Sequence, residues 1–353
     1  MKINLPKFNE LVKQKYITVQ KHEQTDLLIW NYSHTCQYDK KWTPETMMAR
    51  GLITDLEGNI KALPFKKFFN MSEHTGEDST LPSLPLEEFE VFDKMDGSLG
   101  ILYWIGEEPR IATRGSFTSD QAIKGTGMLR KYPNAVWDRQ YTYLFEIIYP
   151  ENRIVVDYGG NEKLVLLAVI DTETGKEKSR SDIESRYTGR VPLVDRFDFD
   201  HIEEILGMMR ENAEGFVIRF KSGVRTKLKY EEYVRLHRLI TGVNAKTIWE
   251  LLRNNQPFDE LMERVPDEFY VWVKSTKAHL QGQFDGTETY SKQVLEQAKK
   301  YYKNRKDQAK FIMESTKAPS VVFSMLDGKD YSKVIWQMLK PRADKPWKED
   351  IDS

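Results

Sequence analysis

The sequence predicts an α+β protein, with a strand-rich domain over residues 1–240 and a helical domain over residues 241–353. Short alternating strands and turns occupy most of residues 27–229, and the spacing of apolar residues becomes helical from Tyr230 onward. A chain of 353 residues is long enough for two domains, each with its own core. The change of periodicity therefore places the predicted domain boundary near residue 240.

Helical spacing is also expected in three stretches among the strands of the first domain, near residues 6–14, 119–131 and 201–210. In the second domain, apolar residues recur at helical spacing in three groups: Ile248, Leu251 and Leu252; Phe269, Val271 and Val273; and Val294, Ala298 and Tyr302. A segment with two prolines, residues 341–346, ends the last predicted helix and leaves a polar tail. The second domain is therefore predicted to consist of helices.

One turn of the first domain sets a lysine between two strand-like runs. Residues 89–92 and 100–105 are β-rich, and between them Lys94, Asp96 and Gly97 form the pattern K-x-D-G. Gly97 lets the backbone approach a ligand closely. A lysine amine attacks phosphorus only when neutral, and burial or neighbouring cations favour that form. The turn thus suggests a nucleophilic lysine, although the tetrapeptide by itself is better explained by a hairpin turn with a solvated lysine.

Further motifs lie along the chain in a fixed order. Downstream of the lysine come Thr113-Arg114-Gly115-Ser116, Tyr143-Leu144-Phe145-Glu146, Glu214-Gly215-Phe216-Val217 and Lys227-Leu228-Lys229. Their order and spacing match the motifs of enzymes that carry a nucleotide covalently on lysine. Upstream, Ala49-Arg50-Gly51 and Lys66-Lys67-Phe68-Phe69 resemble segments of the phage-type RNA ligase 1 family. Over about residues 30–240, the chain therefore resembles the ATP-dependent RNA ligases of that family.

This resemblance implies that residues 1–240 form a nucleotidyltransferase (adenylation) domain of antiparallel sheets with flanking helices. An all-α C-terminal domain, acting as an RNA-specificity domain, would follow. The resemblance also implies ATP and Mg²⁺ or Mn²⁺ as cofactors. Lys94 would attack the α-phosphate of ATP, displace pyrophosphate and carry AMP as lysyl-AMP. AMP would then pass to an RNA 5′-phosphate, and a 3′-hydroxyl would displace it to join the ends.

Four residues are the predicted catalytic groups: Lys94, Lys227, Lys229 and Glu214. Lys227 and Lys229 lie two positions apart on one strand, so both ammonium groups point to the same face. By resemblance, they offset charge at the α-phosphate. Glu146 and Glu214 lie in apolar strand segments, where an ionised carboxylate needs a partner. The resemblance assigns Glu146 to ribose hydroxyls and Glu214 to the lysine or a hydrated divalent metal, and structural salt bridges are the alternative for both.

A wider set of residues is predicted to bind the nucleotide: Arg50, Lys67, Phe69, Gly97, Arg114, Glu146 and Gly215. By resemblance, Arg50 and Lys67 hold the β- and γ-phosphates, and Phe69 packs in the nucleotide pocket unless it is a core residue. Arg114 stands where the family usually has lysine, and its planar guanidinium binds phosphate differently from a point charge. Mg²⁺ keeps several waters and needs few protein ligands, so a carboxylate cage is not required.

Composition limits the possible partners and location. The net charge is −1, so RNA affinity must come from local patches such as residues 221–229 and 299–306. In the second patch, Tyr301 and Tyr302 lie among cations, which suits binding of phosphates and bases. A solvated helix face with both tyrosines packed inward explains the second patch equally well.

Cys36 has no cysteine partner for a disulfide. No membrane span or signal peptide is apparent, so we expect cytoplasmic residence, in the host if the protein is phage-encoded.

Other functions share part of this pattern. DNA ligases and mRNA capping guanylyltransferases use the same lysine chemistry, but they commonly continue after K-x-K with a β-rich OB domain, whereas helices are predicted here. A non-catalytic RNA-binding module is a further alternative, although every charged motif position is populated. The resemblance implies RNA with 5′-phosphate and 3′-hydroxyl ends as the partner, with nicked tRNA as the expected substrate. A polynucleotide kinase-phosphatase would prepare those ends, and no membrane partner is expected.

Overall fold

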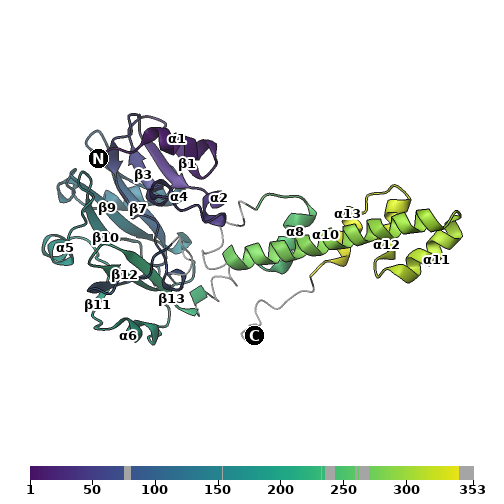
Figure 1. The fold of residues 1–353 in the computed structure, drawn as a ribbon. Helices are drawn as coiled ribbons and strands as arrows, with labels where there is room; N and C mark the ends of the chain where they lie inside the picture. Colours follow the sequence, from purple (N-terminus) through teal and green to yellow (C-terminus); the bar gives the residue numbers. More distant parts are fainter. Residues whose placement is uncertain are drawn as a thin grey trace. The chain divides into compact units, whose positions relative to one another are not determined.

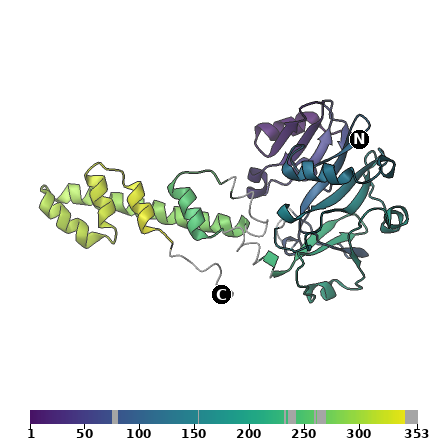
Figure 2. The same ribbon diagram turned by 180° about the vertical axis from the view of Figure 1, so that it is seen from behind.

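The computed structural model describes residues 1–74, 81–152, 154–231, 233–234, 243–258, 261 and 270–341. The chain divides into two compact units, Met1–Ile240 and Thr241–Ser353. Figures 1 and 2 show the described strands gathered in the first unit and a long helix in the second.

The first sheet is built from the four strands nearest the N-terminus, all paired antiparallel in the order β1-β2-β3-β4. These strands are β1 (Ile17–Lys21), β2 (Leu28–Tyr32), β3 (Arg50–Thr54) and β4 (Ile60–Ala62). Helix α1 (Leu5–Lys13) precedes them, and α2 (His34–Tyr38) and α3 (Pro44–Met48) connect β2 to β3. Asn4, Ser33 and Thr43 each accept a backbone N–H at the start of one of these helices, which explains why the helices begin there.

The second sheet has the antiparallel order β10-β9-β7-β8. Its strands are β7 (Ser98–Ile105), β8 (Glu108–Ala112), β9 (Tyr141–Ile148) and β10 (Lys163–Asp171). Helices α4 (Asp120–Leu129) and α5 (Arg180–Tyr187) contribute Met128, Leu129, Ile183 and Tyr187 to a core on one face of this sheet. Short 3₁₀ turns occur at η1 (Met71–Glu73), η2 (Asn134–Val136) and η3 (Pro150–Asn152).

The third sheet has the order β11-β6-β12-β13-β5, and only its β13–β5 pair is parallel. Its strands are β5 (Phe69–Asn70), β6 (Phe89–Asp93), β11 (Arg196–Phe197), β12 (Gly215–Phe220) and β13 (Arg225–Lys229). Helix α6 (Ile202–Leu206) contributes Ile205 to the core on one face of this sheet. Val91, Phe216 and Ile218 belong to the same core, so the residues that alternate with them point to the opposite face.

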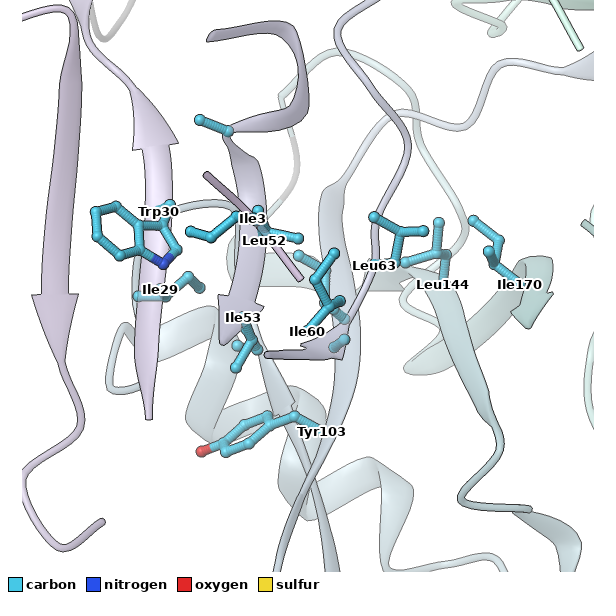
Figure 3. Packing of buried hydrophobic residues seen from close by; sticks show 14 of the residues in the cluster. Ile3, Ile29, Trp30, Leu52, Ile53, Ile60, Leu63, Tyr103, Leu144 and Ile170 are labelled. Atoms are coloured by element: carbon cyan, nitrogen blue, oxygen red, sulfur yellow. The ribbon is translucent and has the colours of Figure 1, made fainter. Parts of the chain in front are cut away.

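The largest core joins the first and second sheets (Figure 3). Trp30 and Ile53 come from the first sheet, and Tyr103 and Leu144 come from the second. Glu146 follows Leu144 by two positions on β9, so the period-two alternation of a strand points it to the same side of the sheet.

All elements in the described part of the second unit are helices: α8 (Ala245–Arg253), α10 (Tyr270–Tyr301), α11 (Arg305–Ser315), α12 (Pro319–Leu326) and α13 (Ser332–Met338). A small core joins three of them through Val294 and Ala298 of α10, Ile312 of α11 and Val322 of α12. The Trp249 indole N–H donates to the Trp336 carbonyl at 2.7 Å and so connects α8 with α13.

The expected helices of the first domain correspond to α1, α4 and α6, but α6 is shorter than residues 201–210 because Gly207 occupies its C-cap. Helices α2, α3 and α5 were not predicted from the sequence. Helices α2 and α3 have five residues each, too few for a 3.6-residue period to repeat twice. In the second unit, α8 contains the first predicted group, and α10 contains the other two except Phe269 and Tyr302. Tyr302 directly follows α10, whereas Phe269 and the 342–346 part of the proline segment lie outside the described residues.

Candidate active site

Lys94 lies where the chain passes from β6 of the third sheet to β7 of the second. Its backbone N–H donates to the carbonyl of Gly215 at 3.0 Å, which ties the lysine to the start of β12. On the other side of β12, Gly215 pairs with Lys229 at the end of β13. The end of β6, the start of β12 and the end of β13 therefore meet at one place, and Glu214 lies directly before β12.

Glu214 bridges the two lysines at this place. Its Oε1 atom lies 2.7 Å from Lys94 Nζ and 3.2 Å from Lys229 Nζ. The side chains of Glu214 and Lys229 are 4% and 9% exposed, whereas that of Lys94 is 19% exposed. Burial alone would raise the pKa of Glu214, but the two ammonium groups outweigh burial and hold the pKa below its ordinary value. Glu214 is therefore ionised at neutral pH, and Lys94 is the most accessible of the three.

The cationic side chains of β13 continue away from Lys94 along one face of the third sheet. Arg225, Lys227 and Lys229 alternate with Thr226 and Leu228, so the three cations share a face. Each step along this row spans two residues, or about 6.6 Å. The structure thus places both lysines of the K-x-K motif on the Lys94 side of the sheet, with Arg225 farther along.

Asp96 anchors the lysine turn to distant segments. Its carboxylate is 3% exposed, and Oδ2 accepts hydrogen bonds from the backbone N–H groups of Val155 and Val156, both at 2.8 Å. Oδ1 accepts the Tyr233 hydroxyl at 2.9 Å, and the Asp96 backbone N–H donates to the Tyr158 hydroxyl at 2.8 Å. The aspartate of the K-x-D-G motif is thereby fully engaged in holding the loop that presents Lys94.

Close strand packing explains two of the glycines at the site. A Cβ atom at Gly97 would lie 2.7 Å from the carbonyl oxygen of Ile147, and one at Gly215 would overlap the carbonyl oxygen of Leu228. Gly215 also has a φ of +144°, a conformation that L side chains rarely adopt. Both glycines therefore have a structural role, and their predicted contact with a nucleotide stays a prediction.

Glu146 lies on β9 between Leu99 and Val165 of the neighbouring strands. Its side chain keeps some exposure but is otherwise surrounded by protein. Burial raises the pKa of Glu146 to about 8; the positive charge of Lys94 offsets part of this rise, and the negative charge of Glu214 adds to it. The carboxyl is therefore largely protonated at neutral pH and can both donate and accept a hydrogen bond, as a hydroxyl ligand requires.

This raised pKa predicts a stability difference that depends on pH. In the unfolded chain Glu146 ionises near its ordinary pKa, whereas in the folded protein it keeps its proton up to about pH 8. The folded state therefore loses stability as pH rises between these values. Glu146→Gln cannot ionise and escapes this loss. We compare the unfolding free energy of Glu146→Gln with that of the native protein. The difference, variant minus native, should increase with pH up to about pH 8 and then stay level.

Urea denaturation of the ligand-free proteins across this pH range measures the difference. The exposed Glu57 provides the control for the replacement itself, because Glu57→Gln removes a surface carboxylate of the same unit. A pH-independent difference between the Glu146→Gln variant and the native protein would contradict the protonated carboxyl.

Lys67 is enclosed by aromatic rings. Its Nζ atom lies 5.5 Å from the ring centroid of Tyr32 and 5.3 Å from those of Trp42 and Phe69, and the residue is 6% exposed. Such contacts attract an ammonium group to the ring faces. The Tyr32 hydroxyl also accepts a hydrogen bond from Arg114 Nη1 at 3.1 Å. Tyr32 therefore connects two of the predicted phosphate ligands, which are far apart in the sequence.

Tyr32 and Trp42 were not predicted as site residues from the sequence. Tyr32 looks like the last residue of an alternating strand, and Trp42 lies in a short connection, so neither carries a distinctive local pattern. Phe69 is 3% exposed and packs against Trp42 with a centroid distance of 5.3 Å. It is thus a core residue that also forms one wall around Lys67.

Arg50 belongs to a neighbouring group of contacts. Its guanidinium lies 5.4 Å from the ring centroid of Phe68, and its charge acts on Glu146 together with that of Lys94. Glu146 therefore connects Arg50 electrostatically with the lysine cluster. The structure brings the predicted residues into two adjoining groups, one around Lys94 and one around Lys67.

Cys36 does not have the properties of a catalytic thiol. Cys36 is buried, and burial raises the pKa of its thiol to about 11, so it is not a reactive thiolate at neutral pH. Within the described ranges, no cluster of three or more His, Cys, Asp or Glu side chains could hold a metal. Among the helices that the structure describes, none has both the length and the apolar character needed to cross a membrane.

A family model, a curated relative and two solved structures are similar to this chain. Residues 48–234 match the family model described as RNA ligase. The RNA ligase of Rhodothermus phage RM378 is 23% identical over 346 aligned positions, which cover 77% of this chain and 78% of that protein. A solved archaeal ATP-dependent RNA ligase aligns with 14% identity and a TM-score of 0.47 over 93% of this chain and 80% of that one. A Naegleria gruberi RNA ligase, solved with pyrophosphate, aligns with 20% identity and a TM-score of 0.35. The alignment covers 42% of this chain and 51% of that one.

Proposed function

The chain belongs to the RNA ligase family, and we propose that it joins RNA ends with ATP through lysyl-AMP and adenylylated RNA. The Lys94 amine attacks the α-phosphorus of ATP, forming an N–P bond as the P–O bond to pyrophosphate breaks. An oxygen of the RNA 5′-phosphate then attacks the same phosphorus, and the N–P bond breaks as the Lys94 nitrogen regains a proton. Finally a 3′-hydroxyl attacks the RNA 5′-phosphorus, which forms the phosphodiester and releases AMP.

The observation that carries this proposal is the contact of Glu214 with both Lys94 and Lys229. Before attack the Lys94 ammonium must give up a proton, and the ionised Glu214 carboxylate at 2.7 Å is positioned to accept it. Lys229 and Lys227 supply positive charge on the same face, where negative charge accumulates on the transferring phosphoryl group. A nucleophile, a proton acceptor and charge stabilisation are thus held within one short segment of the sheet.

The nucleotide would extend from this segment to the second group of residues. Glu146 is suited to the ribose hydroxyls because its protonated carboxyl both donates and accepts. Lys67, Arg50 and Arg114 would hold the β- and γ-phosphates, with Lys67 fixed in position by its aromatic walls. The planar Arg114 guanidinium is kept in place by its hydrogen bond to Tyr32.

The residues of this site fit a divalent cation in the manner of Mg²⁺. Mg²⁺ is bound by one or two carboxylates together with substrate phosphates and waters. Glu214 is the ionised carboxyl group that would hold it beside the phosphates. A bound cation would offset phosphate charge as a Lewis acid.

The two units would have different roles in the joining reaction. We assign the first unit to nucleotidyl transfer and the second, as an all-helical domain, to selection of the RNA. The physiological task that fits the resemblance is repair of a nicked tRNA, after a polynucleotide kinase-phosphatase has prepared the ends. A surface cluster at the end of α10, here called the α10 basic cluster, supports the assignment: Lys299, Lys300, Tyr301, Lys303 and Lys306.

Within this cluster the two tyrosines have different roles. Tyr301 is 66% exposed, with Lys300 Nζ 5.4 Å from its ring centroid, whereas Tyr302 packs on Phe311 at 5.3 Å. Arg305 pairs with Asp327. Tyr301 is therefore the tyrosine that could stack on an unpaired base, and Tyr302 belongs to the packing of the helices.

This difference gives a prediction for RNA affinity. Stacking on an aromatic side chain contributes about 1–3 kcal/mol per base, so Tyr301→Ala should weaken binding of a nicked tRNA roughly five- to hundredfold. Lysyl-AMP formation should not change. The control is Tyr290→Ala, which removes another exposed tyrosine of α10 outside the cluster. Filter-binding titrations measure the affinity, and equal effects of the two substitutions would contradict the role of Tyr301.

The experiment that tests the function is a label-transfer assay with ATP and GTP, each labelled at the α-phosphate. A covalent AMP adduct, followed by sealing of RNA, is the expected result. A covalent GMP adduct would instead identify a capping guanylyltransferase. If neither label attaches, the protein is a non-catalytic RNA-binding module.

A further inference from the structure

A cleft of about 1080 Å³ lies in the first unit, at the other end of the strands that carry Lys94. Glu90 near the start of β6, Arg219 near the end of β12 and Arg225 at the start of β13 line it. These three residues are directly opposite each other in the strand register, so their side chains share one face of the sheet. Nothing in the nucleotide chemistry proposed above uses this cleft, apart from Lys67 and Phe69 at its margin.

The strand that carries Lys227 and Lys229 also reaches the cleft. Lys229, Lys227 and Arg225 form one row on β13, and Arg225 is the member that enters the cleft. Arg225 and Lys229 lie four positions apart on the strand, a distance of about 13 Å. A single row of cations therefore runs from the nucleophile to the cleft.

Two phenylalanine rings of the cleft lie between two cations, Arg50 and Arg225. The Arg50 guanidinium lies 5.4 Å from the Phe68 ring, Phe68 meets Phe65 edge-on at 6.4 Å, and the Arg225 guanidinium lies 4.1 Å from the Phe65 ring. Both phenylalanines line the cleft and are only half-buried. Grooves for single-stranded nucleic acid combine such rings, on which bases stack, with cations that follow the backbone.

The charged side chains of the cleft include a group of mostly buried ion pairs and two exposed lysines. Glu177 lies 2.8 Å from Arg225 and 2.6 Å from Arg219, and Glu90 lies 2.5 Å from Arg219. These mostly buried pairs hold the guanidinium groups in place and neutralise much of their charge. Lys66 and Lys176 line the cleft with exposed side chains, so they supply the positive charge that a phosphate backbone would meet.

We propose that this cleft binds the 5′-phosphorylated end of a single-stranded RNA and guides it to lysyl-AMP. The proposal rests on the proposed function and adds where the RNA lies. In phosphoryl transfer the attacking and leaving groups are roughly in line. In the second step Lys94 is the leaving group, so the RNA phosphate must arrive opposite Lys94, from the side by which pyrophosphate left in the first step. Lys67, assigned above to the departing phosphates, lines this same cleft.

The test separates the first step from the second. Lysyl-AMP formation and the transfer of AMP to a 5′-phosphorylated RNA of ten nucleotides are measured for the native protein and for the double variant K66A/K176A. The matched control is K13A/K131A, which removes two exposed lysines of the same unit outside the cleft. RNA is kept below saturation, and transfer starts from the isolated lysyl-AMP enzyme.

For K66A/K176A we expect lysyl-AMP formation within twofold of the native rate and AMP transfer roughly tenfold slower, because two phosphate contacts are lost. The salt dependence of RNA binding should also fall, by about 1.4 in log–log slope for two single-strand contacts. The proposal is overturned if AMP transfer in K66A/K176A equals that of the control. It is also overturned if lysyl-AMP formation falls by the same factor as transfer. If the native protein forms no lysyl-AMP at all, the proposed function fails as well, and this outcome is distinguishable from the other two.

Discussion

Lys94→Ala is expected to form no lysyl-AMP and to join no RNA from ATP. Alanine has no nucleophile, and no other lysine of the site occupies the turn whose backbone is tied to Gly215 and whose aspartate is held by Val155 and Val156. Loss of a covalent nucleophile lowers the rate by about 10⁴-fold or more, which places the product below detection. Labelled ATP and denaturing electrophoresis measure the adduct.

The same variant should still seal RNA that already carries AMP on its 5′-phosphate, because Lys94 is not a reactant in that step. This retained activity shows that the protein is folded. Lys131→Ala, at an exposed position after α4, is the control for replacing any lysine. A Lys94→Ala protein that seals adenylylated RNA yet still forms a covalent AMP adduct would rule out Lys94 as the nucleophile.

Glu214→Gln is expected to lower lysyl-AMP formation at least about a hundredfold and to destabilise the protein by about 3 kcal/mol. The substitution keeps the size of the side chain but removes the charge that Lys94 and Lys229 share at 2.7 and 3.2 Å. Two largely buried ammonium groups then lie close together without their counterion. The proton acceptor beside Lys94 is lost in the same change.

Glu108 offers a matched comparison, because it too pairs with two cations, Arg110 and Arg130, but is 44% exposed. An exposed pair contributes roughly 0–1 kcal/mol, so Glu108→Gln should change stability little and catalysis not at all. Chemical denaturation gives the stabilities, and single-turnover adenylylation gives the rates. Nearly native adenylylation by a folded Glu214→Gln protein would remove Glu214 from the proposed chemistry.

The sequence by itself determined those features that depend on neighbours in the chain. The strand period placed Lys227 and Lys229 on one face of β13, and the β-rich runs around the K-x-D-G turn correspond to β6 and β7. The helical spacing of apolar residues in α8 and α10 follows from the same kind of periodicity. Backbone geometry alone sets these patterns, so they are visible without any tertiary contact.

Tertiary structure decided how the groups meet. Glu214 reaches Lys94 only because β12 lies between β6 and β13, a pairing order that no local pattern specifies. The anchoring of Asp96 by Tyr233 joins residues 137 positions apart. The aromatic enclosure of Lys67 likewise draws Tyr32 from the first sheet.

Burial decided the charge states at the site. From the sequence, Glu146 and Glu214 are two similar carboxyl groups in apolar strands. In the structure, Glu214 is ionised by its two lysines, whereas burial keeps Glu146 protonated to about pH 8. A protonation state depends on desolvation and on charges brought close by folding, and both arise from the packing of distant strands. Periodicity could identify both carboxyl groups, but only the packed sheets distinguish an ionised partner for lysine from a neutral partner for a hydroxyl.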